Sequence, residues 1–171
     1  MEERALYEIG DTVVCPHHGA GEVIDVSRRE HDGEATPYLT IKIIHSDLTV
    51  MVPVENAVRA GIRSCIPEKI VEEVVGVLRD DPTMMPQNWN RRYKHNREKI
   101  KSGDVFEVAD VVRNLALLDS AKGLSTGEKQ MFGRVKRILA SEFMYAKQLP
   151  EQDALVYLET ILKEICVEAA E

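Results

Sequence analysis

The sequence lacks the features that mark a membrane protein or a disulfide-stabilised protein. No apolar run approaches the length of about 20 residues needed to cross a bilayer, and residues 1–4 lack the basic-then-apolar pattern of a signal peptide. The three cysteines (Cys15, Cys65 and Cys166) lie far apart without a Cys-x-x-Cys pair, which indicates reduced thiols. We therefore expect a cytoplasmic protein without membrane contact.

Common enzyme motifs are also missing. The sequence contains no Gly-x-Gly-x-x-Gly, no Gly-Lys-Ser/Thr phosphate loop and no His-Glu-x-x-His. Cys15, His17 and His18 form one cluster with metal-ligand chemistry, but the other histidines lack ligand-like spacing. A turn between two strands at Gly19 is the simpler interpretation, and a metal site is the alternative. We expect no enzyme activity and no cofactor.

The net charge of −7 hides an uneven distribution of charge along the chain. Residues 1–85 hold 8 basic and 16 acidic side chains, and residues 138–171 hold 2 basic and 7 acidic ones. Residues 86–137, in contrast, hold 12 basic and 6 acidic side chains. The acidic total argues against a protein that coats nucleic acid, whereas the central block favours a local anionic partner.

The amino-terminal part has the pattern of short β-strands. Between residues 9 and 58, β-branched runs alternate with turn-forming residues. Leu39, Ile41 and Ile43 share one face of a predicted strand while Lys42 lies on the other, as in a half-buried antiparallel strand. Four or five such strands in about 55 residues favour a small barrel or a strongly bent sheet.

After Pro67 the apolar period becomes helical. A stripe from Ile70 to Leu78 predicts a helix that ends before Pro82, and further helices are predicted after Asn88 and Asp104, and at the capping-box pattern that Ser125 begins. A last helix is predicted to start at Pro150. The chain is thus predicted to be α+β, with a β domain at 1–66 and a bundle of about five α-helices at 67–171.

The densest part of the basic block is residues 88–99, which contain the only tryptophan, Trp89. Basic side chains there can contact phosphates, and the indole can pack on an exposed base or wedge into a minor groove. Alternatively, Trp89 fills a gap in the hydrophobic core and the cations form a solvated face. A second basic group on the capping-box helix could extend the same surface: Lys129, Arg134, Lys136 and Arg137.

Several motifs, in the same order along nearly the whole chain, resemble the CarD family of bacterial transcription regulators, and its actinobacterial type most. They include IGDTVVCPHHG at 9–19, DLTVMVPVEN at 47–56, NWNRRYK at 88–94 and GLSTGEK at 123–129. The resemblance implies an N-terminal Tudor-like (SH3-like) β-barrel that binds the β subunit of RNA polymerase. It also implies a C-terminal helical domain that meets promoter double-stranded DNA at the upstream edge of the transcription bubble.

The resemblance implies roles for individual residues. The family's tryptophan, which Trp89 matches, inserts at the minor groove and hinders collapse of the bubble. The expected DNA contacts are Trp89, Asn90, Arg91, Arg92, Lys94 and Lys129. The expected polymerase contacts are Arg29, Thr49, Val50, Met51, Val52 and Pro53. Met51 departs from the family, because close relatives carry an arginine there; backbone pairing along the strand edge does not depend on that side chain.

The resemblance therefore implies a non-enzymatic regulator of transcription initiation that stabilises the open promoter complex, and we expect it to act as a monomer. The alternative is a protein-interaction adaptor of the transcription machinery that makes no direct DNA contact. Dependence of promoter-complex stability on Arg91 and Lys94 distinguishes the two hypotheses.

Overall fold

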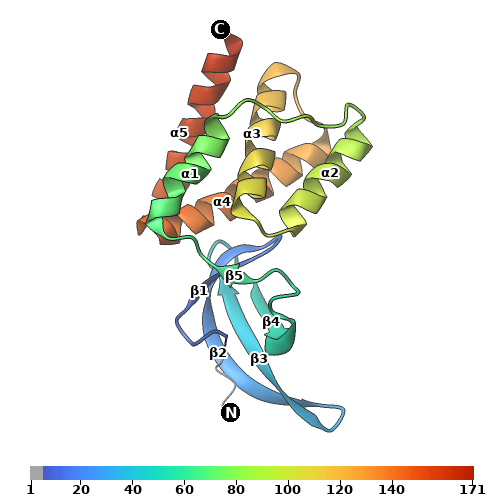
Figure 1. Cartoon of the computed structure of the whole chain (residues 1–171), viewed down its shortest axis with the longest axis vertical. Helices are drawn as coiled ribbons and strands as arrows, with labels where there is room; N and C mark the ends of the chain where they lie inside the picture. The colour runs from blue at the N-terminus through green and yellow to red at the C-terminus, as the bar shows by residue number, and fades with distance from the viewer. Residues whose placement is uncertain (1–5) are drawn as a thin grey trace.

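The chain folds into an antiparallel sheet followed by five α-helices (Figure 1), which confirms the predicted α+β class. The structure, a computed structural model, describes residues 6–171. Residues 1–4, on which the expected cytoplasmic location partly rests, lie outside the described residues. The strands are β1 (Thr12–Cys15), β2 (Gly19–His31), β3 (Glu34–Ile43), β4 (Thr49–Pro53) and β5 (Arg63–Ser64), and a 3-10 helix η1 (Val54–Asn56) follows β4. The helices are α1 (Glu68–Arg79), α2 (Trp89–Lys101), α3 (Val105–Ala121), α4 (Thr126–Lys147) and α5 (Glu151–Ala170).

The five strands form one sheet in the order β4-β3-β2-β1-β5, with antiparallel pairing throughout. β2 and β3 are the longest strands, and they are joined by a two-residue turn at Asp32 and Gly33. Both turn residues have positive φ (52° and 82°), the geometry that matches the twist of a tight hairpin. A register shift between Val23 and Asp25 bends β2, because an extra residue increases the local twist.

The predicted alternation on β3 is confirmed. Leu39, Ile41 and Ile43 are buried in the core of the sheet, while Lys42 between them is exposed. Each fully buried aliphatic side chain of this kind contributes about 1.5–3 kcal/mol by leaving water. The alternating pattern therefore fixes which face of the hairpin covers the core, because a shift of one residue would reverse the two faces.

The helical domain has its own core, and α3 lies between α1 and α2 (Figure 1). The predicted stripe of α1 is buried through Val71, Val74 and Leu78. The capping box at the start of α4 is also confirmed, since Ser125 and Glu128 exchange hydrogen bonds at 3.1 and 3.3 Å. None of the helices between residues 6 and 171 combines the length and the apolar character that a bilayer span requires.

Hydrogen bonds and a buried ion pair join the sheet to the helices. Arg63 of β5 donates from Nη1 and Nη2 to the carboxylate of Glu142 on α4 at 2.5 and 2.8 Å. Its Nε donates to the Gly103 carbonyl between α2 and α3 at 2.6 Å. At the start of β2, the Ala20 N–H donates to Ser141 Oγ of α4 at 2.9 Å. These bonds fix the orientation of the helices relative to the sheet.

Candidate functional site

Trp89 is the first residue of α2, and its side chain is half exposed. Asn88 caps this helix: its side-chain oxygen accepts hydrogen bonds from the N–H groups of Asn90 and Arg91 at 3.1 and 3.2 Å. Trp89 is 52% exposed and is not part of the hydrophobic core, whereas Tyr93, one turn later, packs against that core. The indole therefore has ring surface free for a ligand.

The irregular segment at 80–88 that precedes α2 is tied to α3. The Thr83 N–H donates to Asn114 Oδ1 at 3.2 Å, and Thr83 Oγ1 donates to the carboxylate of Asp110 at 2.9 Å. Asp110 also forms an ion pair with Lys99 of α2. Burial raises the pKa of Asp110, but the hydrogen bonds from Lys99 and Thr83 outweigh burial and lower the pKa below its ordinary value. An ionised carboxylate thus holds the segment on α3.

Arg92 holds the other end of this segment. Its Nη1 donates to the Gln87 carbonyl at 2.9 Å, and its Nε donates to the carboxylate of Glu128 at 2.5 Å. The Glu128 side chain is 1% exposed. Burial raises the pKa of Glu128, but hydrogen bonds from Arg92 and Ser125 lower it below its ordinary value. The guanidinium of Arg92, expected to contact DNA, is therefore already paired within the fold.

The other expected DNA contacts lie on the surface: Asn90, Arg91, Lys94 and Lys129. Within residues 6–171, none of these three cations forms an ion pair. Gly127 lies beside Tyr93, since a Cβ at Gly127 would stand 3.8 Å from that ring. The first turns of α2 and α4 therefore adjoin, and their unpaired charges belong to one region of the surface.

The strand expected to contact polymerase is β4, which forms one edge of the sheet. Among the described strands it pairs with β3 alone. Val50 and Val52 pack against the core of the sheet, Thr49 and Met51 are exposed, and Pro53 is half-buried at the end of the strand. The backbone groups on its outer side can accept a further strand, the usual geometry of β-strand addition.

Arg29, the other expected polymerase contact, lies on the β2–β3 hairpin, where it pairs with Thr36 in a part of β3 that β4 does not reach. Thr36 and Thr40, the β3 partner of Met51, are four residues apart, a distance of about 13 Å along a strand. The hairpin points away from the helices (Figure 1). Arg29 and Met51 thus share an extended surface and do not meet in a pocket.

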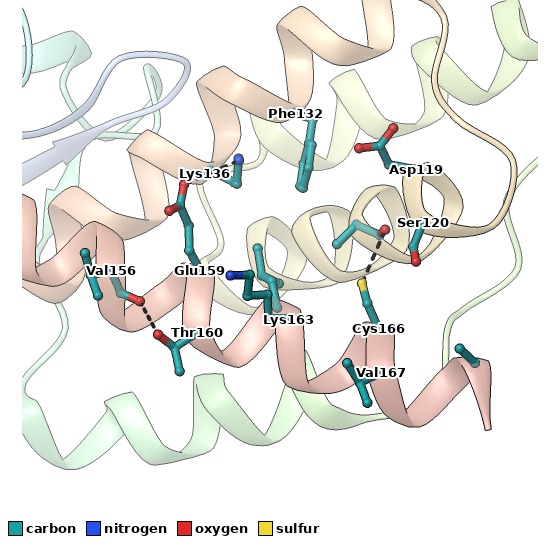
Figure 2. Close-up of a pocket in the computed structure, with 13 residues that line it drawn as sticks. Asp119, Ser120, Phe132, Lys136, Val156, Glu159, Thr160, Lys163, Cys166 and Val167 are labelled. Atoms are coloured by element: carbon teal, nitrogen blue, oxygen red, sulfur yellow. Dashed lines mark hydrogen bonds and ion pairs between the residues drawn. The ribbon is translucent and has the colours of Figure 1, made fainter.

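A groove of about 670 Å³ lies between α3, α4 and α5 (Figure 2). Lys136 pairs with Glu159 across it at 3.7 Å, and Thr160 Oγ1 donates to a backbone carbonyl of α5 at 2.8 Å. The Cys166 thiol donates to a carbonyl of α3 at 3.6 Å, and burial raises its pKa. Among the described residues that line this groove, no nucleophile is paired with an activating base.

The cluster of Cys15, His17 and His18 is the turn between β1 and β2. The His18 N–H donates to the Cys15 carbonyl at 3.1 Å, while His17 and Gly19 both have positive φ. Burial raises the pKa of the Cys15 thiol to about 11. In the chain from residue 6 onward, no three histidine, cysteine or acidic side chains are placed to share a metal ion. The structure confirms the turn.

Sequence reasoning missed the buried polar side chains of α3, among which Asp110 pairs with Lys99 of α2. Arg113 is 1% exposed, donates to the Val77 carbonyl at 2.7 Å and pairs with Asp110. The available signal was the spacing of Asp110, Arg113 and Asn114 inside an otherwise apolar helix. Polar residues three and four positions apart on a buried face must find partners, because an unpaired buried charge is costly.

Comparison with known proteins agrees with this fold. A family model described as "CarD-like/TRCF RID domain" matches residues 7–66, and one described as "CarD, C-terminal domain" matches residues 73–159. The candidate transcription factor YdeB of Bacillus subtilis (strain 168) is 31% identical over 147 residues, which are 86% of this chain and 96% of YdeB.

The fold and the matches define a regulator of transcription that joins a polymerase-interaction domain to a helical domain. The chain belongs to the CarD family of transcription factors. Interaction with RNA polymerase follows from the first of its two domains, and the exposed Trp89 lies in the second.

Proposed function

We propose that the protein binds the β subunit of RNA polymerase through β4 and the β2–β3 hairpin, and stabilises the open promoter complex through the start of α2. Trp89 carries the DNA half of this proposal: it is 52% exposed on a helix start that Asn88, Arg92 and Asp110 hold in place. A helix start that is already ordered loses little backbone entropy when its indole inserts beside a base.

Stabilisation of the open state requires a contact that the closed promoter does not offer. A ligand shifts an equilibrium only by the difference between its affinities for the two states. An apolar ring fits between unstacked bases or in a distorted minor groove, and undistorted duplex offers neither. A difference of about 1.4 kcal/mol changes the ratio of open to closed promoters tenfold.

The polymerase half of the proposal explains how such a weak contact suffices. β4 offers an unpaired strand edge and Arg29 adds a charge on the hairpin. Binding to polymerase raises the effective concentration of α2 at the promoter, so the DNA contacts need little affinity of their own. We propose that one copy of the chain acts on each polymerase, in the cytoplasm where bacterial transcription occurs.

Within this function we assign Arg92 a positioning role. Its guanidinium is paired with Glu128 and bonded to the Gln87 carbonyl, so it orients the segment that leads into Trp89. Arg91, Lys94 and Lys129 remain the proposed phosphate contacts, because their charges are exposed and unpaired within the described chain.

The test compares Trp89→Ala with wild type in a promoter-opening assay with purified holoenzyme. Stacking of a base on an aromatic side chain is worth about 1–3 kcal/mol, so we expect the protein-dependent open-complex lifetime to fall about fivefold or more. Phe106→Ala is the matched control, because Phe106 is another exposed aromatic residue of the helical domain. Polymerase binding should be unchanged in both variants.

Two outcomes would contradict the proposal. If Trp89→Ala stabilises open complexes as well as wild type does, the indole is not the contact. If Arg91→Gln with Lys94→Gln also leaves the lifetime and its salt dependence unchanged, the adaptor hypothesis is correct and the helical domain does not touch DNA.

A further inference from the structure

The exposed cations of α2 continue well beyond Trp89. Arg91, Lys94, Arg97 and Lys101 follow one another at spacings of three, three and four residues, which keep them on one side of the helix. All four are exposed, and none forms an ion pair within residues 6–171. One carboxylate, that of Glu98, lies on the same side of α2 as these four cations. The positive surface therefore extends along the whole of α2 to its carboxyl end.

At that end, α2 meets the β1–β2 turn of the sheet domain. Pro16 of the turn packs so closely on Gly61 and Gly103 that an added Cβ would stand 2.8 and 3.3 Å from its Cγ. The next residue, His17, has a φ of 68° and is half-buried, and His18 is exposed. A dark blue loop of the sheet domain reaches the lower end of α2 in Figure 1. The turn thus continues the surface of α2 into the other domain.

Positive charges from three elements act on the His17 side chain. Burial is the largest cause that lowers the pKa of His17. The charges of His18 on the same turn, of Arg134 on α4, and of Lys101 and Arg97 on α2 lower it further. Arg134 is exposed and unpaired in the described structure, as Lys101 and Arg97 are. Every one of these charges acts in the same direction and lowers the pKa. Cations brought together in this way repel each other, and an anion between them relieves that repulsion.

We propose that Arg97, Lys101, Arg134 and the turn at His17–His18 form a second contact region for the phosphate backbone of duplex DNA, next to the Trp89 site. The sheet domain then takes part in DNA binding as well as in polymerase binding. Continuity with the Trp89 site and the sign of the charge identify the partner as duplex DNA. This inference rests on the proposed function, and it extends the contact away from the bubble edge.

The dimensions fit this partner. The twelve steps from Trp89 to Lys101 span about 18 Å at 1.5 Å per residue. Duplex DNA advances about 3.4 Å per base pair, so the contact region covers about five base pairs beyond the base at Trp89. Rigid duplex holds its phosphates at a regular spacing beside such a row of charges, which single-stranded DNA does not do unaided.

The test uses the full chain with holoenzyme and promoter DNA, and removes charge without removing Trp89. In the charge variant, Arg97→Gln, Lys101→Gln and Arg134→Gln are combined. Lys69→Gln with Lys163→Gln is the control for loss of charge elsewhere on the helices, since both lysines are exposed and unpaired in the described helices. In the turn variant, His17→Asn and His18→Asn are combined, because asparagine also adopts positive φ. Melting temperatures confirm that each variant is folded.

Two readouts are measured: the salt dependence of the protein-dependent open-complex stability, and the hydroxyl-radical footprint on the duplex. Each phosphate contact contributes about 0.9 to the slope of log K against log salt, so the charge variant should lower the slope by about 2 to 3. It should also lose the protection of about five base pairs next to the Trp89 site. The turn variant should lose only the part of that protection farthest from Trp89. The control should match wild type.

The outcomes separate this inference from the proposed function. If the charge variant keeps the wild-type slope and footprint while Trp89→Ala shortens the open-complex lifetime, the second contact region is refuted and the proposed function stands. If Trp89→Ala has no effect either, the proposed function fails. If the charge variant weakens binding to holoenzyme in the absence of DNA, the partner of this surface is an acidic protein face and the inference is overturned.

Discussion

Removal of Arg63 is expected to destabilise the protein more than removal of any exposed cation. The Glu142 side chain is 3% exposed and accepts hydrogen bonds from Arg63 Nη1 and Nη2 and from the Ile66 N–H. Burial lowers the pKa of Arg63, but its bonds to Glu142 raise it above the ordinary value, so the guanidinium stays charged. Arg63→Met leaves the buried carboxylate with a single donor, which costs about 3–5 kcal/mol.

The double variant shows where that cost arises. In Arg63→Met with Glu142→Leu no buried charge is left unpaired, so its free energy of unfolding should exceed that of the single variant by about 2 kcal/mol. The remaining loss comes from the Ile66 N–H, which no longer has the acceptor that it uses at 2.9 Å, and from the Gly103 carbonyl, which no longer has Arg63 Nε as its donor at 2.6 Å. Arg79→Met serves as control, because Arg79 pairs with Glu164 on the surface; its effect should be small.

Urea unfolding followed by circular dichroism gives the free energies, and heat gives the melting temperatures. For a chain of this length, 1 kcal/mol corresponds to about 2–4 °C, so Arg63→Met should melt roughly 6–20 °C below wild type. Hydrogen exchange at Ile66 and Ala20, whose N–H groups donate across the joint, reports its local opening. Equal stability of the single and double variants would refute the reasoning, because the unpaired charge would then carry no cost.

Three further predictions concern pH, polymerase affinity and the sheet. The pKa values of Glu128 and Asp110 are lowered in the folded state, so their stabilisation is present above the unfolded values of about 4 and is lost as pH falls through the folded ones. Glu128→Gln should therefore flatten the dependence of the urea midpoint on pH below about pH 5, and an unchanged pH profile contradicts this. Met51→Arg adds a charge on the β4 edge and should raise holoenzyme affinity several-fold in an equilibrium binding assay; equal affinity places residue 51 outside the interface. Gly21→Ala makes a Cβ clash with the Lys42 carbonyl oxygen, so it should abolish β2–β3 pairing and polymerase binding, and a normal circular dichroism spectrum would argue against the observed register.

The sequence predicted best those structural features that depend on residues close together in the chain. The alternation of Leu39, Ile41 and Ile43, and the helix start at Ser125, follow from patterns a few residues long. Arg63 and Glu142 are 79 residues apart in the chain. No local pattern connects two such residues, because their pairing depends on how the sheet packs on α4.

The basic block also has features that a local pattern predicts and features that depend on long-range packing. A helix pattern places Trp89 and Tyr93 on one side, but it does not say where the core ends along that side. The structure buries Tyr93 partly and leaves Trp89 half exposed, since the segment held by Thr83 and Asp110 determines where α2 begins. For the same reason, Arg92 could not be distinguished from Arg91 by residue type alone, although only Arg92 is paired with Glu128.

The net charge of −7 and the proposed DNA-binding role are compatible because the charges lie on different parts of the molecule. Repulsion between acidic side chains and DNA is screened beyond about 10 Å at 0.1 M salt, so it acts mainly where those side chains approach the phosphates. The helix α2 lies at one side of the helical domain, while β4 and the β2–β3 hairpin lie below the helices in Figure 1. A weak contact at α2 gains from binding at β4 only if the two surfaces keep a fixed separation, because a flexible connection dilutes the tethered site over a larger volume. The bonds between Arg63 and Glu142 and between Ala20 and Ser141 supply that rigidity. Under the proposed function, loosening the joint should therefore weaken open-complex stabilisation even where Trp89 and the β4 edge are both intact.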